Sequence, residues 1–122
     1  MVNIIEKGWG REIIFADNNM YCGKLLVFDK TGSKGSMHYH LNKHETWYVN
    51  QGSFKLYLIN PENASLSYIH LYTGDRWVNE RGFPHQLEAL EDNSIIFEVS
   101  TSDDSHDSYR VFPGDSQREI PS

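Results

Sequence analysis

The sequence predicts an all-β protein that folds as a sandwich or a jelly-roll β-barrel. β-Branched and aromatic residues occur in short runs, and Gly, Pro, Asn and Asp separate these runs. Helix signals are almost absent. Short strands at regular spacing favour two packed sheets or a barrel, since closure protects the sheet edges. At 122 residues the chain is long enough for one domain with a core and too short for two.

The expected strands follow one another in chain order, and each is a run of apolar, β-branched or aromatic residues. They cover residues 11–15, 21–29, 36–40, 46–50, 54–60, 65–71, 76–78, 86–90 and 95–100. Gly, Pro, Asn or Asp mark the turns between them, at 17–19, 30–35, 51–52, 61–64 and 91–93. The sequence therefore predicts nine strands with short connections.

A polar tail covers about residues 100–122. Its composition is compatible with disorder, yet Tyr109, Val111 and Phe112 give part of it side chains to bury. We therefore treat residues 1–122 as a single domain whose tail can fold back on the barrel.

Composition limits the partners and the location of the protein. The formal charge of −6 argues against nucleic acid or an anionic membrane, because both require a basic surface. A single cysteine, Cys22, excludes an internal disulfide framework. No apolar run approaches the length of a membrane span, and the N-terminus does not resemble a signal peptide. We expect a soluble, cytoplasmic protein.

The segment 35–52 carries residue types that bind metals. His38 and His40 lie two apart on an expected strand, so their side chains project from the same face. Glu45 begins the next run. Imidazole suits zinc, copper, iron and nickel, and a carboxylate extends the choice to manganese. Later in the chain, Gly82 and Pro84 shape a turn that leads into His85, a candidate fourth ligand.

These two segments resemble the two motifs of the cupin superfamily. The first contains Gly35, the His38-x-His40 pair, Glu45 and Gly52, and the second contains Gly, Pro and His85. The resemblance implies a single cupin jelly-roll barrel that binds one divalent metal ion, Zn, Mn, Fe or Ni, through the residues His38, His40, Glu45 and His85. It also implies a homodimer.

A finer resemblance links the chain to the type II phosphomannose isomerase domain. It rests on short segments that begin at Trp9, Tyr21, Met37, Pro84 and Glu98, and on the tail segment 107–110. The resemblance implies a metal-dependent isomerase that acts on a sugar or a sugar phosphate. The tail is spaced differently from that family, and its usual Tyr-Gly-Arg ending is missing.

Aldose–ketose isomerisation needs a base, a group that stabilises an enediolate oxygen, and a clamp for the substrate. We assign Glu98 as the base, on a strand expected to place apolar residues on the opposite face. Lys24 and Arg110 are the candidate clamps for a phosphate or another oxyanion. Burial would raise the pKa of Glu98, and a nearby metal or Lys would lower it.

Each assignment has a structural alternative. Lys24 and Glu98 would face solvent if they lay on the outer side of the sheet, and Arg110 would form an ordinary surface ion pair. His44 is adjacent to Glu45 but lies off the alternation of His38 and His40, so we expect it to be a loop residue. Trp47 lies two residues from Glu45 and is a candidate for lining the pocket, where a sugar could stack on it.

Three classes of function remain open. A metal-dependent isomerase acting on a small sugar-derived substrate is the first. The same ligand set also serves non-haem iron or copper oxygenases, so the ligands alone do not separate the two. The third is a small-molecule-binding protein without catalysis. Oxygen uptake, aldose–ketose interconversion and binding without turnover distinguish the three.

Overall fold

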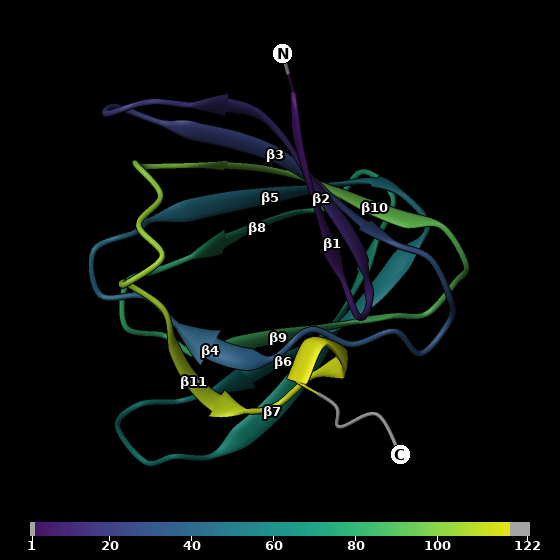
Figure 1. The fold of residues 1–122 in the computed structure, drawn as a ribbon. Coiled ribbons are helices and arrows are strands. Elements are labelled where there is room, and N and C mark those ends of the chain that lie inside the picture. The colour runs from purple at the N-terminus through teal and green to yellow at the C-terminus, as the bar shows by residue number, and fades with distance from the viewer. Residues whose placement is uncertain (1, 118–122) are drawn as a thin grey trace, which may run out of the picture.

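The protein folds into two facing antiparallel sheets, which confirms the all-β jelly-roll prediction (Figure 1). The computed structural model describes residues 2–117. The six-stranded sheet has the order β1 (Asn3–Lys7), β2 (Gly10–Asp17), β3 (Cys22–Phe28), β10 (Ser94–Ser100), β5 (Glu45–Gln51) and β8 (Arg76–Asn79). The five-stranded sheet has the order β11 (Tyr109–Phe112), β4 (Met37–Tyr39), β9 (His85–Ala89), β6 (Ser53–Ile59) and β7 (Leu66–Tyr72).

All nine predicted strands are present, with ends that differ by no more than two residues. A 3-10 turn, η1 (Asp115–Gln117), is the only helical element between residues 2 and 117. No helix in that range has the length and hydrophobicity of a transmembrane span.

The strand β1 was not predicted. It forms a hairpin with β2, in which Lys7 pairs with Gly10 across the turn. Residues 3–6 are all exposed, so buried and exposed positions do not alternate along this strand. Backbone pairing alone holds it, and periodicity in the sequence cannot reveal such a strand.

The tail returns to the barrel and adds the strand β11. In Figure 1 it descends from the end of β10, in the upper sheet, to pair beside β4 in the lower sheet. Tyr109 pairs with Tyr39, and their rings stack at 5.2 Å. The expectation that Tyr109, Val111 and Phe112 become buried is wrong, because they remain 40%, 42% and 46% exposed. Residues 118–122 of the predicted tail lie outside the described range.

A hydrophobic core lies between the two sheets. Trp9 stacks on Phe28 with ring centroids 4.3 Å apart, and Phe28 meets Phe54 edge-on at 5.2 Å. Leu56 and Ile96 are fully buried in the same cluster. This core fills one end of the space between the sheets.

The other end of the same space is polar, because several strands carry apolar residues at one end of their inner face and polar residues at the other. Since alternate residues share a face, β5 turns Glu45, Trp47 and Val49 inward in succession. The strand β3 turns Lys24 and then Leu26 and Phe28 inward, and β9 does the same with His85, Leu87 and Ala89. In β10, Ile96 and Glu98 share the inner face. The pairing register brings Lys24, Trp47 and Glu98 together at the polar end.

Two glycines allow the turns that place the motifs. Gly52 has a φ of +77° between β5 and β6, and a Cβ there would collide with the Ser94 side chain. Gly82 has a φ of +79°, and its N–H donates to the carbonyl of His40. Both positions lie in the left-handed region that favours glycine. The second turn therefore joins the loop before His85 to the end of the His38-x-His40 segment.

Candidate metal centre

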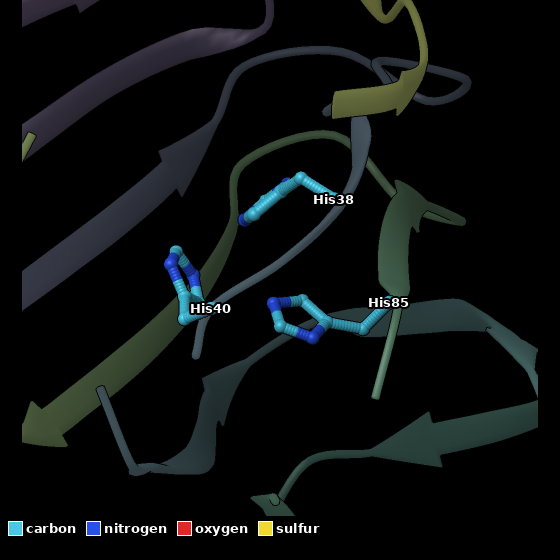
Figure 2. A group of neighbouring side chains, drawn as sticks. All are labelled: His38, His40 and His85. Carbon is cyan, nitrogen blue, oxygen red and sulfur yellow. The ribbon is translucent and has the colours of Figure 1, made fainter. Parts of the chain in front are cut away.

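Three histidines from two adjacent strands converge in the polar end of the barrel. His38 lies on β4, His40 follows that strand, and His85 begins β9 directly opposite His38. One ring nitrogen from each lies within 4.8 Å of the others. Figure 2 shows the three rings turned toward a common centre. The predicted shared orientation of His38 and His40 is confirmed.

Main-chain carbonyls fix the tautomer of each ring. The Nδ1 atom lies 3.0 Å from the Ser36 carbonyl in His38, 2.6 Å from the Asp107 carbonyl in His40, and 3.0 Å from the Phe83 carbonyl in His85. A carbonyl oxygen only accepts, so each Nδ1 carries the proton and each Nε2 of a neutral ring keeps a lone pair. Metal-binding histidines in proteins are held in this way.

The buried surroundings keep two of these rings neutral. Burial, together with the neighbouring His85 and His40, lowers the pKa of His38 to about 3. Burial also lowers the pKa of His40. The Nε2 atom of His85 is buried and has no hydrogen-bond partner among the described residues. Glu45 Oε1 faces that nitrogen at 3.0 Å. The lone pairs of a neutral ring nitrogen and of a carboxylate oxygen repel at this distance unless a cation lies between them, so the three rings fit a metal ion.

Glu45 lies beside the three imidazoles. Its Oε1 atom is 3.0 Å from His85 Nε2 and 3.9 Å from His40 Nε2. Burial alone would raise the pKa of Glu45, but His85 and Lys43 outweigh it and hold the pKa well below its usual value. The side chain is therefore an ionised carboxylate at the position that the first motif assigns to it.

Lys43 is a site residue that the sequence did not reveal. Its ammonium nitrogen lies 3.1 Å from Glu98 Oε2, 3.3 Å from Glu45 Oε2 and 3.3 Å from Asp103 Oδ1. These carboxylates overcome the effect of burial and raise the pKa of Lys43. Lys43 stands in a polar loop, and carboxylates from β5, from β10 and from the segment after β10 surround its ammonium group. No periodicity in the sequence marks such a residue.

Glu98 is buried within the same cluster, so the solvent-facing alternative is wrong. Its Oε1 atom accepts a hydrogen bond of 3.0 Å from Trp47 Nε1. Its Oε2 atom is ion-paired with Lys43 but makes no hydrogen bond of good geometry to a described residue. Burial and the charge of Glu45 raise the pKa of Glu98 to about 7, against the effect of Lys43 and Lys24. Glu98 shares its face with Ile96, while Phe97 and Val99 point outward.

Lys24 is also buried, which rules out a solvated strand lysine. Its ammonium nitrogen lies 3.3 Å from Asp103, 3.6 Å from Glu12 and 3.8 Å from Glu98. The three carboxylates offset burial and raise the pKa of Lys24. Because they surround the ammonium group, this arrangement favours a role in holding Glu98 over the predicted role of a phosphate clamp.

The charges of this network leave room for a divalent cation. Glu12, Glu45, Glu98 and Asp103 contribute four carboxylates, and Lys24 and Lys43 contribute two ammonium groups, all linked by contacts of 3.8 Å or less. Two positive charges would balance the cluster when every group is ionised. Three imidazole nitrogens and one carboxylate are suitable ligands for Zn, Mn, Fe or Ni. The chain can therefore hold a single metal ion here.

Arg110 lies on β11 directly opposite His38. Residues paired across two antiparallel strands point to the same face, so Arg110 points to the side on which His38 meets the other rings. Tyr109 and Tyr39 stack as the neighbouring pair and fix this register. No carboxylate between residues 2 and 117 forms an ion pair with Arg110.

A cavity of about 530 Å³ contains this group of residues. His38, His40, His85, Glu45, Glu98, Lys24, Lys43, Trp47 and Arg110 all line it. The volume is that of a small-molecule site. Trp47 lines the cavity as expected, and its ring meets His85 edge-on at 5.3 Å. His44 lies outside it and pairs with Glu80 at 3.1 Å, in agreement with a loop role.

Asp107 ties the tail to the metal centre. Its carboxylate accepts hydrogen bonds from the main-chain N–H groups of Leu41, Asn42 and Lys43. Burial opposes ionisation, but these hydrogen bonds lower the pKa of Asp107. Its carbonyl also fixes the His40 ring. The sequence shows an aspartate in a polar tail, and nothing there indicates that it closes the loop between His40 and Glu45.

Comparison with solved structures supports the fold. The capsular polysaccharide assembling protein CapF from Staphylococcus aureus matches with a TM-score of 0.78 and 15% identity over 92% of this chain and 33% of CapF. KdgF from Halomonas sp. matches with a TM-score of 0.67 and 24% identity over 79% of this chain and 81% of KdgF.

Bacillus subtilis oxalate decarboxylase, a protein with Mn(II) centres, matches with a TM-score of 0.76 and 18% identity over 90% of this chain and 30% of its own. The chain thus spans about a third of the length of CapF and of oxalate decarboxylase. No curated protein matches the sequence. These comparisons do not support the finer resemblance to type II phosphomannose isomerase.

The family comparison covers both metal-binding segments. The model of the Cupin family matches residues 21–121, which include His38, His40, Glu45 and His85. The two-sheet fold and the three converging imidazoles agree with that match. The chain belongs to the cupin family.

Proposed function

We propose that this protein is a metal-dependent isomerase of a small sugar or sugar phosphate. In this proposal His38, His40, Glu45 and His85 hold one divalent ion, and Glu98 moves the proton. The observation that carries the proposal is the Glu98 carboxylate. It is buried in the same cavity as the three imidazoles, and its Oε2 atom has no hydrogen bond within the described chain. Lys43 lies 3.1 Å from this atom, and the pKa of the carboxyl group is raised to about 7, so the group can both take up and release a proton.

A bound divalent ion would polarise the carbonyl and hydroxyl oxygens of the substrate and so stabilise the charge of an enediolate. The residues of the chain perform the remaining work. Glu98 removes the proton from the carbon that bears the hydroxyl group and returns it to the adjacent carbonyl carbon, while the hydroxyl proton passes to the former carbonyl oxygen, so that an aldose becomes a ketose with no net gain or loss of protons.

The contacts of Glu98 suit this task. The indole N–H of Trp47 holds Oε1, and the Lys43 ammonium group lies 3.1 Å from Oε2, so the carboxyl group is fixed within the cavity. Lys43 and Lys24 stabilise the ionised carboxylate that forms when the proton leaves. Glu98 itself is only 3% exposed, so its carboxyl group has little contact with solvent.

A sugar-derived substrate is supported by the character of the cavity and by one similar structure. The cavity is lined by charged side chains together with Trp47, which offers a flat face to a sugar ring. Arg110 at its edge could bind a phosphate or another oxyanion with two parallel hydrogen bonds. CapF is a capsular polysaccharide assembling protein, so this fold occurs in a protein of polysaccharide metabolism.

The test measures deuterium exchange and turnover in the metal-loaded protein. Sugars and sugar phosphates are incubated in D₂O with protein loaded with Zn, Mn, Fe or Ni, and NMR follows both exchange next to the carbonyl and aldose–ketose conversion. We expect both to occur, and Glu98→Gln to lower them by at least about 100-fold while metal content is unchanged. Glu88→Gln is the matched control, because Glu88 contacts Tyr57 and does not line the cavity.

Other outcomes would replace this proposal. Oxygen uptake by the iron-loaded protein, without isomerisation, would identify an oxygenase. Tight binding of a sugar without exchange or turnover would identify a binding protein.

We further propose that the chain forms a homodimer through the outer face of its six-stranded sheet. Tyr48 and Phe97 are paired across β5 and β10 and remain 47% and 38% exposed, and Val99 beside them is 59% exposed. Paired exposed apolar side chains favour contact with another surface. Sedimentation of wild-type protein and of Phe97→Lys tests this proposal, and we expect a dimer that the substitution dissociates.

A further inference from the structure

We propose that Asn79 and Lys43 are positioning residues that hold Glu45 from opposite sides, so that one of its oxygens faces the metal and the other is held away. This inference rests on the proposed role of Glu45 as a ligand, and its test separates the two. Neither residue was a candidate on sequence grounds.

Asn79 supports the oxygen that faces the histidines. It lies on β8 opposite Glu45 on β5 and is 4% exposed. Its Nδ2 atom donates a hydrogen bond of 3.1 Å to Glu45 Oε1, the atom that lies 3.0 Å from His85 Nε2. Asn79 does not line the 530 Å³ cavity. It therefore acts on Glu45 and not on a substrate.

Trp77 determines which way the Asn79 amide points. Its Nε1 atom lies 2.9 Å from Asn79 Oδ1, on the same face of β8. An indole N–H can only donate, so the amide atom beside it must be the oxygen. The amide nitrogen is then directed at Glu45. The flipped amide would place its N–H group against the indole N–H, where neither group could accept, so only this orientation fits both neighbours. Trp77 thus fixes the donor that faces the carboxylate.

Lys43 holds the second oxygen of Glu45. Its ammonium nitrogen lies 3.3 Å from Oε2, while Glu98 and Asp103 hold the ammonium group in place. Oε2 of Glu45 therefore contacts the ammonium group that also binds Glu98, while Oε1 faces the imidazoles. A carboxylate held in this way presents a single oxygen to the metal.

The two residues should affect metal affinity in opposite directions. Loss of the Asn79 amide removes the hydrogen bond that orients Oε1, and loss of such an outer-shell partner lowers metal affinity roughly 10- to 100-fold. Loss of the Lys43 charge removes a cation that competes with the metal for Glu45, and it frees Oε2 to bind the metal as a second oxygen. Metal affinity should therefore stay the same or rise. A general loss of structure would weaken binding in both variants.

The experiment titrates apo protein with Mn²⁺ and with Zn²⁺ by calorimetry and records the visible spectrum of the Co²⁺ form. We expect Asn79→Leu to weaken binding by about 10-fold or more, Trp77→Phe to weaken it less, and Lys43→Met to bind at least as tightly as wild type. The Co²⁺ spectrum should change in Asn79→Leu and in Lys43→Met, since both alter the Glu45 carboxylate.

Gln86→Leu is the matched control. It removes a buried amide that donates to the Gly35 carbonyl, on the face of β9 opposite His85. We expect its metal affinity and Co²⁺ spectrum to equal those of wild type. Unchanged affinity in Asn79→Leu, or weaker binding in Lys43→Met, would overturn the inference. A wild-type protein that binds no metal would instead refute the proposed function.

Discussion

At the scale of single residues, the three histidines show how a ligand is prepared by its surroundings. Each ring uses one nitrogen for a main-chain carbonyl and turns the other inward. The carbonyls belong to Ser36 and Phe83, two residues before His38 and His85, and to Asp107 in the tail. Two of the three rings are therefore oriented by local chain geometry, and the third depends on a distant segment.

Replacement of one histidine should remove the metal. We expect His85→Ala to lose stoichiometric metal, because its Nε2 is buried between the other ligands and no nearby side chain replaces it. Elemental mass spectrometry gives the metal content, and circular dichroism reports whether the barrel is folded. His70→Ala, at an exposed position on β7, is the control and should keep its metal. Full occupancy in a folded His85→Ala protein would refute the ligand assignment.

Lys24 should matter more for stability than a surface lysine. We expect Lys24→Met to lower the free energy of unfolding by about 3 kcal/mol at pH 7, because it leaves buried carboxylates without their counter-charge. Urea unfolding of the apo protein measures this change. Lys30→Met, at an exposed position, should change stability by less than about 0.5 kcal/mol. Equal effects at the two positions would mean that Lys24 is solvated.

At the scale of elements, nine strands were predicted from the sequence, and two strands at the edges of the sheets, β1 and β11, were not. The strands β5 and β10 were predictable because buried and more exposed side chains alternate along them, and β3 and β9 because they are short runs with buried apolar residues. Neither signal marks β1 or β11, whose residues are almost all exposed. Pairing with a neighbour holds these two strands, and the neighbour is known only after folding.

The tail segment before β11 should stabilise the loop that carries Lys43. We expect Asp107→Ala to expose the amides of residues 41–43 to hydrogen exchange, because their three N–H groups lose a common acceptor. Metal affinity should also fall, since the Asp107 carbonyl orients His40. Exchange followed by mass spectrometry measures the first effect and calorimetry the second. Asp17→Ala, at an exposed position at the end of β2 that does not line the cavity, should leave both unchanged.

At the scale of the whole molecule, one barrel contains an apolar end that provides stability and a polar end that provides chemistry. The same four strands contribute to both ends, because each carries a polar residue at one end of its inner face and apolar residues at the other. The polar end contains buried charges whose desolvation is costly. The apolar end therefore supplies the stability that the polar end lacks.

This division predicts that stability and metal binding can be changed separately. We expect Leu56→Ala to lower the free energy of unfolding by about 3 kcal/mol, because Leu56 is fully buried in the hydrophobic core. Metal affinity should not change, since Leu56 does not line the cavity. Urea unfolding of the apo protein and calorimetry of the folded protein measure the two quantities. A parallel loss of metal affinity would show that the two ends are coupled.

The amino-acid sequence alone was sufficient to predict the fold class, nine of the strands and the metal-binding segments. These features are local: alternation reveals a strand with one buried face, and residues two apart on a strand point the same way. The motifs that contain His38, His40, Glu45 and His85 are likewise short and continuous, so these residues can be named from the sequence. Folding brings the three imidazoles together and places Glu45 Oε1 3.0 Å from His85 Nε2.

The surroundings of the metal centre, in contrast, are defined only by the tertiary structure. Lys43, Asn79 and Asp107 stand in the sequence as ordinary polar residues, and folding buries them against Glu45 and His40. It also encloses Lys24 among three carboxylates. Burial and charge pairing depend on which distant segments meet. No local pattern records such contacts, because the side chains that make them come from strands and loops far apart in the chain.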